Sequence, residues 1–330
     1  MHAAELPLLI FTILGQMSVG AFVVLGAINV LGRPIWGSAR IEELSDVALY
    51  AIGPTLVLGF AGSFLHLGNP INSANAMNHV LSSSMSREIL AGVLFAAVGG
   101  VYAVCQLLRI GPATLRQALA VVTALLGVVL VWCMSALYLL PTVPVWNSWT
   151  TPVSFYATAG LLGTMAIATA LVIRLRTPLP LPRLGRRRSA PAAGGEDTPV
   201  DLPDGTSRTL LTQTLTWLLV AAMVMLAVIV VVSLAQLAGL AGHSEPAARQ
   251  SLAILTEHGG LWLVLRIVLS VIGTGVLGMV MLRLRTAPED RAARAWRILP
   301  TIVIVAFVLV LAGEVVGRLL FYSSYARIGM

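Results

Sequence analysis

Long apolar stretches alternate with shorter polar segments along the whole chain. A helix needs about 20 predominantly apolar residues to cross the hydrocarbon layer of a membrane. Eight stretches have this character: 7–31, 44–66, 88–109, 117–140, 152–173, 210–240, 261–283 and 298–322. Within lipid, a helix satisfies its backbone hydrogen bonds internally. The pattern therefore predicts an all-α integral membrane protein, a bundle of eight transmembrane helices.

One polar segment, residues 174–209, is much longer than the others. It contains three consecutive arginines at 186–188, followed by a run rich in alanine, proline, glycine and acidic residues. Such a composition does not build a packed core, so we expect a flexible loop. Because this loop separates spans rather than folding units, residues 1–330 are predicted to form a single membrane domain.

The composition supports a membrane protein and argues against a nucleic-acid partner. The chain is 58% hydrophobic and 11% charged, with a net charge of +7. Soluble domains carry about 25% charged residues. A basic balance in a soluble protein would suggest nucleic acid, but these basic residues lie between apolar stretches. There they set topology and meet anionic lipid head groups.

The basic residues are distributed unevenly between the two membrane faces. All 21 are arginine, and 16 of them lie in, or directly border, the connections that follow the first, third, fifth and seventh stretches. Connections rich in basic residues stay in the cytoplasm. Both termini are therefore predicted to lie outside the cytoplasm, and segment 174–209 inside. The five histidines lie on the outer side: His2, His66, His79, His243 and His258.

Two residues at successive stretch ends, His66 and Glu88, carry the functional prediction. His66 ends the second stretch and Glu88 begins the third, so both are expected at the outer face. Each has a structural explanation, since a histidine suits a helix C-terminus and a glutamate a helix N-terminus, with Ser86 as a possible cap. Together, an imidazole and a carboxylate at one face are suited to accept two protons from a hydroquinone.

Other polar residues lie within the stretches. Glu314 and Arg318 have the i,i+4 spacing of a helical ion pair, and Arg266 is placed to reach the same depth. Intramembrane charges usually face the bundle interior or a wet cavity. Structural ion pairs among these three are favoured over a direct ligand role. Gln16, deep in the first stretch, is a candidate hydrogen-bond partner for a ring carbonyl.

The sequence predicts no metal, haem or iron–sulfur cluster in this chain. Cys105 and Cys133 lie inside apolar stretches, without a CxxC partner or a nearby histidine. Buried cysteines usually behave as small apolar residues. A haem held by two axial histidines needs both within the bundle, and His66 is the only histidine that a span presents, at its end.

Several segments carry a resemblance to a known family. They are Leu65–Pro70 continuing to Ser84–Ile89, the opening Pro7–Thr12 with Gly15 and Gln16, the middle Leu140–Pro144 with Trp146 and Asn147, and the ending Gly313–Arg318 with Phe321 and Tyr322. In these segments the chain resembles the membrane-anchor subunit of bacterial dimethyl sulfoxide reductase. The resemblance spans the chain, although segment 174–209 shows no matching feature.

The resemblance implies an eight-helix anchor without haem in the bacterial cytoplasmic membrane. It implies that menaquinol is bound and oxidised, and that electrons pass to a ferredoxin-like iron–sulfur subunit and on to a molybdopterin catalytic subunit, in a heterotrimer. His66 and Glu88 match the quinol-site positions of the family, and Gln16 and Arg87 are further candidate quinol contacts. The chain itself would not act on the terminal acceptor, which the catalytic subunit selects.

A proton-coupled secondary transporter is the alternative interpretation. A glutamate within a span is compatible with such a function. Transporters, however, tend to show internal repeats and broken helices near the membrane midplane, and the sequence shows neither clearly. An anchor copurifies with iron–sulfur and molybdenum subunits, whereas a transporter moves solute by itself.

Overall fold

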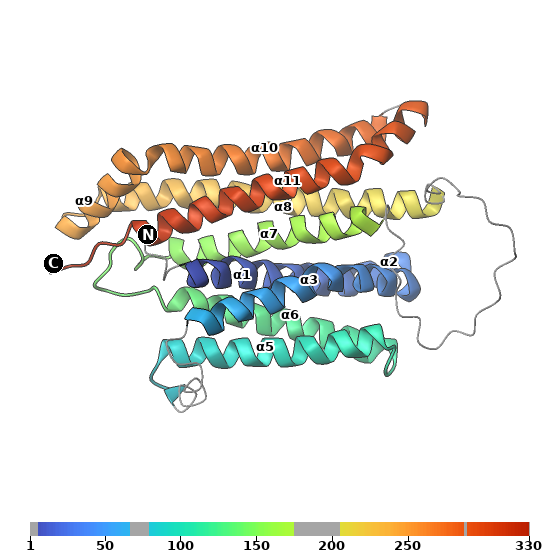
Figure 1. The fold of residues 1–330 in the computed structure, drawn as a ribbon, viewed down its shortest axis with the longest axis horizontal. Helices are drawn as coiled ribbons and strands as arrows, with labels where there is room; N and C mark the ends of the chain where they lie inside the picture. The colour runs from blue at the N-terminus through green and yellow to red at the C-terminus, as the bar shows by residue number, and fades with distance from the viewer. Residues whose placement is uncertain (1–5, 67–78, 175–204, 287–288, 330) are drawn as a thin grey trace, which may run out of the picture.

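The computed structural model describes residues 6–66, 79–174, 205–286 and 289–329, with the backbone alone at 63–66, 205–208, 284–286 and 289–295 (Figure 1). All regular secondary structure in these ranges is helical. The long helices are α1 (Leu6–Ala27), α3 (Ser38–His66), α5 (Ser84–Leu107), α6 (Ala113–Ala136), α7 (Thr150–Arg174), α8 (Gly205–Ala241), α10 (Gly260–Thr286) and α11 (Glu289–Ser323). The short elements are η2 (Ile28–Gly32), α2 (Arg33–Trp36), α9 (Pro246–Ala253) and η5 (Ile254–His258).

Eight helices within the described ranges are long and apolar enough to cross a membrane. This confirms the predicted all-α bundle with eight membrane-spanning helices. The helices run side by side, and α1 begins at the same end of the bundle at which α11 ends (Figure 1). We call this end the terminal end and the other the opposite end. Helix α3 also ends, and α5 begins, at the terminal end.

The second crossing begins earlier than the apolar pattern indicated. Helix α3 starts at Ser38, directly after Gly37, whose φ of 79° is a conformation that glycine adopts readily. The first turns of α3 carry Glu42 and Asp46, which interrupt the apolar pattern. Both carboxylates are nevertheless accommodated, because arginines of the α5–α6 hairpin pair with them.

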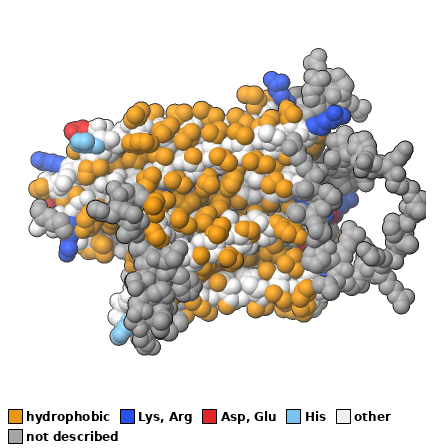
Figure 2. All heavy atoms as spheres, in the orientation of Figure 1, with side chains coloured by type: hydrophobic (Ala, Val, Ile, Leu, Met, Phe, Trp, Pro, Cys, Tyr) orange, Lys and Arg blue, Asp and Glu red, His pale blue; other side chains and the backbone are white. Residues whose placement is uncertain are grey.

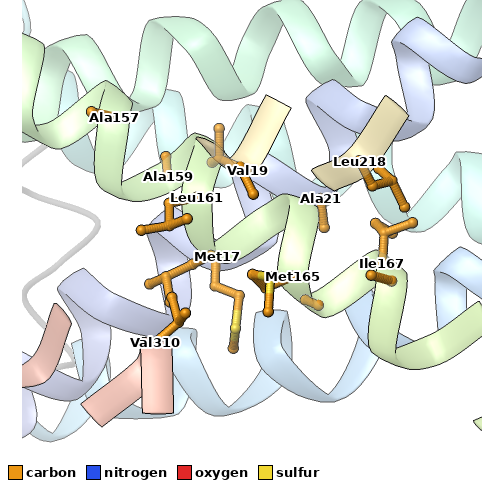
Figure 3. Packing of buried hydrophobic residues seen from close by; sticks show 14 of the residues in the cluster. Met17, Val19, Ala21, Ala157, Ala159, Leu161, Met165, Ile167, Leu218 and Val310 are labelled. Atoms are coloured by element: carbon orange, nitrogen blue, oxygen red, sulfur yellow. The ribbon is translucent and has the colours of Figure 1, made fainter. Parts of the chain in front are cut away.

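Helices α1 and α7 form the centre of the bundle. They cross at Gly20 and Gly163, where a Cβ atom on either residue would collide with the backbone of the partner helix. Close approach through small residues is a common way of packing helices in membranes. Figure 3 shows buried side chains of this core, among them Met17, Met165 and Val310.

The remaining helices flank the central pair on two sides. Helix α3 packs on α1, and the α5–α6 hairpin packs on α1 through α6. Helices α8, α10 and α11 lie on the other side, where α8 and α11 contact α7 (Figure 1). Hydrophobic side chains cover the middle of the visible face (Figure 2). This surface suits contact with lipid.

Candidate functional site

The helix ends that carry His66 and Glu88 lie at the terminal end of the bundle (Figure 1). Helix α3 ends at His66, and α5 begins at Ser84. The side chain of His66 and residues 67–78 lie outside the described part of the chain. The backbone thus brings both helix ends to one end of the bundle, while direct contact between the two side chains stays a prediction.

Glu88 lies more than one turn inside α5. The N-cap is Ser83, whose hydroxyl accepts a hydrogen bond from the backbone N–H of Ser86 at 3.4 Å, so the prediction that Ser86 caps the helix is wrong. The influence of a helix dipole fades beyond the first turn. Stabilisation by the N-terminus of α5 therefore does not explain the presence of a glutamate at position 88. The side chain is half-buried and has no ion-pair partner among the described residues.

Arg87 holds the turn that leads into α5. Its exposed guanidinium donates from Nε to the carbonyl oxygen of Val80 at 3.0 Å and from Nη2 to that of Leu81 at 3.1 Å. The side chain is thereby occupied with the local backbone. It lies next to Glu88 in the sequence and fixes the start of the same helix.

Five polar side chains form a buried cluster between α1, α7, α10 and α11. We call Gln16, Thr158, Arg266, Glu314 and Arg318 the Glu314 cluster. The Glu314 side chain is 1% exposed, and its Oε2 accepts a hydrogen bond from Thr158 Oγ1 at 2.7 Å. The same oxygen forms an ion pair with Arg266 Nη2 at 3.1 Å. The cluster thus ties α7, α10 and α11 together through one carboxylate.

Arg318 forms no ion pair with a described residue, so the expected i,i+4 pair with Glu314 is wrong. Its Nη2 donates to Gln16 Oε1 at 2.7 Å, and its guanidinium carbon lies 4.0 Å from the centre of the Phe155 ring. The Oε2 atom of Glu314 is already occupied by Arg266 from the neighbouring helix. A cation–π contact and a hydrogen bond replace the ion pair for this buried charge.

Several buried atoms of the Glu314 cluster lack a hydrogen-bond partner. Within the described residues these are Oε1 of Glu314, Nε2 of Gln16 and Nε of Arg266. Buried polar atoms without partners are uncommon because they lose hydration without compensation. The cluster is therefore chemically incomplete and can accept water or a polar group of a ligand.

Aromatic rings close the Glu314 cluster toward the terminal end. They belong to Tyr138, Trp146, Phe155, Phe321 and Tyr322. The hydroxyl oxygens of Tyr138 and Tyr322 lie 3.2 Å apart, and Tyr322 donates to Thr12 Oγ1 at 3.4 Å. Sequence reasoning did not connect these hydroxyls with the candidate site, because the residues lie far apart in the chain.

Tyr138 connects this aromatic group to the end of α6. The residue follows the end of α6 at Ala136. Burial raises the pKa of the Tyr138 phenol well above its ordinary range, and Tyr322 and the Glu88 carboxylate add to the increase. Glu88 and this aromatic group lie at the same end of the bundle, where α5 begins and α6 ends (Figure 1).

A second polar cluster lies at the opposite end of the bundle. We call Glu42, Asp46, Gln106, Arg109 and Arg116 the Glu42 cluster. Arg116 and Arg109 pair with the two oxygens of Glu42 at 2.5 and 3.4 Å. Arg109 and Gln106 donate to the two oxygens of Asp46 at 2.6 and 2.8 Å. Sequence reasoning assigned these arginines to topology alone, although the i,i+4 spacing of the two acids was a usable signal.

The described residues offer proton-accepting and hydrogen-bonding groups rather than a metal-binding set. In the described ranges, no three histidine, cysteine, aspartate or glutamate side chains gather closely enough to hold a metal ion. Cys105 and Cys133 are free thiols, each half-buried.

The sequence matches known proteins over its whole length. A family described as DMSO reductase anchor subunit (DmsC) matches residues 1–179. One subunit of the anaerobic dimethyl sulfoxide reductase of Escherichia coli (strain K12) is 31% identical, over 99% of this sequence and 96% of the relative. A second relative from the same organism, the YnfH subunit of an anaerobic dimethyl sulfoxide reductase, is 28% identical over the same shares of the two sequences.

A third relative matches one part of the sequence more closely. It is a subunit of the anaerobic dimethyl sulfoxide reductase of Haemophilus influenzae, and it is 36% identical over 51% of this sequence and 59% of the relative. The matches agree with the eight apolar helices of the structure. The chain therefore belongs to the DMSO reductase anchor subunit (DmsC) family, whose members are multi-pass proteins of the inner membrane.

Proposed function

We propose that this chain binds and oxidises menaquinol and passes the electrons to an iron–sulfur subunit of a molybdopterin reductase such as dimethyl sulfoxide reductase. One observation carries the proposal. Helix α3 ends at His66, and α5 places Glu88 about one turn after its start, at the same end of the bundle. Membership of the anchor-subunit family supports assembly with catalytic and iron–sulfur partners.

The proposed chemistry assigns one proton to each of two bases. Oxidation of a quinol to a quinone releases two protons and two electrons. Glu88, half-buried and without an ion-pair partner among the described residues, accepts one proton. His66 accepts the other, since an imidazole ordinarily titrates near neutrality. The electrons leave to the iron–sulfur subunit, and the quinone then dissociates into the lipid.

Gln16 and Arg87 take supporting roles in this proposal. Gln16 is fully buried, and its Oε1 accepts from Arg318, which leaves Nε2 as the candidate donor to a ring carbonyl. Arg87 is engaged with backbone carbonyls of the turn before α5. We therefore assign Arg87 to the positioning of Glu88.

The terminal end is proposed to face away from the cytoplasm. Sixteen of the 21 arginines lie in, or directly border, the connections that the positive-inside rule assigns to the cytoplasm. Both termini, His66 and Glu88 are then on the outer side, where the quinol protons are released. The whole chain acts in this proposal as one membrane domain.

The test is menaquinol-driven reduction of the terminal acceptor by the intact complex in membranes. Glu88→Gln and His66→Gln each remove a proton acceptor while keeping a polar side chain of similar size. Loss of such a base typically slows turnover by about 10² to 10⁴-fold. We expect losses in this range, with the subunits still copurifying.

Glu257→Gln and His258→Gln are matched controls, because both residues are exposed and belong to η5. These variants should turn over menaquinol at the wild-type rate. Wild-type quinol oxidation by both site variants would show that the assigned bases are wrong. Purification of the chain without iron–sulfur and molybdenum subunits, together with solute movement in vesicles, would favour the transporter alternative.

A further inference from the structure

We propose that two polar cavities meeting at Gln236 form a water-filled path between the Glu314 cluster and the terminal face, and that this path is the exit for protons. The exit role rests on the proposed quinol oxidation, whereas the existence of the path does not. The first cavity lies among α7, α8, α10 and α11, and the second lies between α8 and the connection 137–149.

The first cavity is small, and its lining mixes polar and apolar side chains. It has a volume of about 50 Å³, and its polar lining includes Ser154, Thr158, Ser233, Gln236, Arg266 and Glu314. A water molecule needs about 10–15 Å³ of such space and two to four polar partners. The cavity therefore has room for roughly three waters, and is far too small for a quinone ring, because ligand pockets measure about 300 Å³ or more.

The charges of the Glu314 cluster favour the presence of water in this cavity. Arg266 and Arg318 bring two guanidinium groups, Glu314 brings one carboxylate, and all three side chains line the cavity. An excess charge in a low-dielectric interior is costly. In addition, Oε1 of Glu314 and Nε of Arg266 have no partner among the described residues. Water supplies the missing donor and acceptor together and screens the excess charge.

The second cavity connects this region with the surface. It has a volume of about 120 Å³ and is lined by residues that include Asn147, Ser148, Trp149, Gln236 and His243. The side chains of Asn147, Trp149 and His243 are exposed. This cavity therefore opens where α8 ends and the α6–α7 connection passes over it, at the terminal end of the bundle (Figure 1).

Gln236 separates the two cavities, because it lines both of them. Its Nε2 donates to the carbonyl oxygen of Val145 at 3.2 Å, so the amide is held across the space between α8 and the connection 137–149. A glutamine in this position offers a donor and an acceptor to water on either side. Gln236 therefore lies between the two cavities without blocking the path, because its side chain is polar and can bind water on both sides.

The path lies at the end of the bundle that carries the proposed quinol bases (Figure 1). Tyr138 contacts Tyr322 there, and Arg318 of the Glu314 cluster packs against Phe155 in the same aromatic group. Protons that leave the quinol bases reach solvent through water ordered by Glu314, while the electrons leave to the iron–sulfur subunit. The path therefore separates proton release from electron transfer.

Thiol accessibility tests the path without any quinol turnover. The probe is 2-hydroxyethyl methanethiosulfonate, a small neutral reagent, added to the complex in liposomes, with modification of this chain followed by mass spectrometry. Thiols react as thiolates, which form next to water and not in lipid, so Ser233→Cys should react at least about tenfold faster than Val231→Cys. Val231 is the matched control, since it lies two residues away on α8 and is 61% exposed on the apolar surface.

Gln236→Phe supplies the second variant, because it places an apolar ring where the cavities meet. In the Ser233→Cys protein it should slow modification, and during turnover it should delay the appearance of protons relative to reduction of the terminal acceptor. Equal labelling of Ser233→Cys and Val231→Cys would overturn the path. Fast labelling combined with wild-type proton release by Gln236→Phe would overturn its role as the exit. Neither result bears on the bases His66 and Glu88.

Discussion

The Glu42 cluster and the Glu314 cluster contain the same kinds of side chain at two different levels of the bundle, but only in the first does every carboxylate oxygen have a donor among the described residues. All four carboxylate oxygens of Glu42 and Asp46 have a guanidinium or amide donor. In the Glu314 cluster, two donors share Oε2 of Glu314, and Oε1 has none among the described residues.

The difference indicates what each cluster does. A buried ionic cluster whose carboxylate oxygens are all paired holds helices in register, and removing one member exposes an uncompensated charge. The Glu42 cluster therefore locks α3 to the α5–α6 hairpin. A cluster with an open acceptor beside a cavity needs water or a ligand to complete it. The Glu314 cluster therefore belongs to the end of the bundle at which we place proton chemistry.

The largest effect on stability is expected from Asp46→Asn. The amide has the shape of the carboxylate, but one of its atoms becomes a donor that faces Gln106 or Arg109. Breaking a satisfied buried ionic contact in this way should lower the free energy of unfolding by about 3 kcal/mol. The measurement is unfolding of the detergent-solubilised protein by increasing SDS, followed by circular dichroism.

Glu43→Gln is the control for this measurement. Glu43 is adjacent to the Glu42 cluster, but its side chain is 64% exposed and its ion pair with Arg174 is long, at 3.5 Å. Exposed ion pairs contribute about 0–1 kcal/mol, so stability should be almost unchanged. If Glu43→Gln lowered the free energy of unfolding as much as Asp46→Asn, the Glu42 cluster would not be what holds α3 to the α5–α6 hairpin.

A smaller effect is expected from Glu314→Gln. The amide oxygen can take the place of Oε2 and keep the hydrogen bonds from Thr158 and Arg266, while the amide nitrogen replaces the open Oε1 and faces the cavity. The loss should be about 1 kcal/mol, because both hydrogen bonds are kept and water in the proposed cavity screens the two guanidinium charges that lose their carboxylate. The same SDS titration compares the two variants directly. Equal losses for Asp46→Asn and Glu314→Gln would contradict the distinction between a closed and an open cluster.

Much of the fold could be predicted because span length and apolar character are local properties of a sequence. The eight crossings follow from stretches of sufficient length, and the structure contains eight such helices in the ranges it describes. The early start of α3 was missed because Glu42, which precedes the predicted stretch, looks unfavourable in isolation. Only its arginine partners on the α5–α6 hairpin make it acceptable within a helix, and those contacts are not visible from hydropathy.

The candidate site was predictable where it depends on helix ends, and hidden where it depends on distant contacts. His66 and Glu88 follow from the order of two consecutive stretches. The contact between Arg318 and Gln16 joins residues 302 positions apart. The i,i+4 rule favoured Glu314 as the partner of Arg318, but Arg266 of the preceding helix, which the sequence places at the same depth, pairs with that carboxylate instead. Local spacing alone does not show which of two arginines pairs with a buried carboxylate.

Photoaffinity labelling with an azido-menaquinone tests the central claim most directly, because it locates the quinol in the bundle. The intact complex is irradiated with the probe, and labelled peptides of this protein are identified with and without excess menaquinol. We expect competed label at the terminal end, in peptides that contain His66 or Glu88. Competed label confined to the opposite end, in peptides that contain Glu42 or Arg109, would contradict the proposed quinol site.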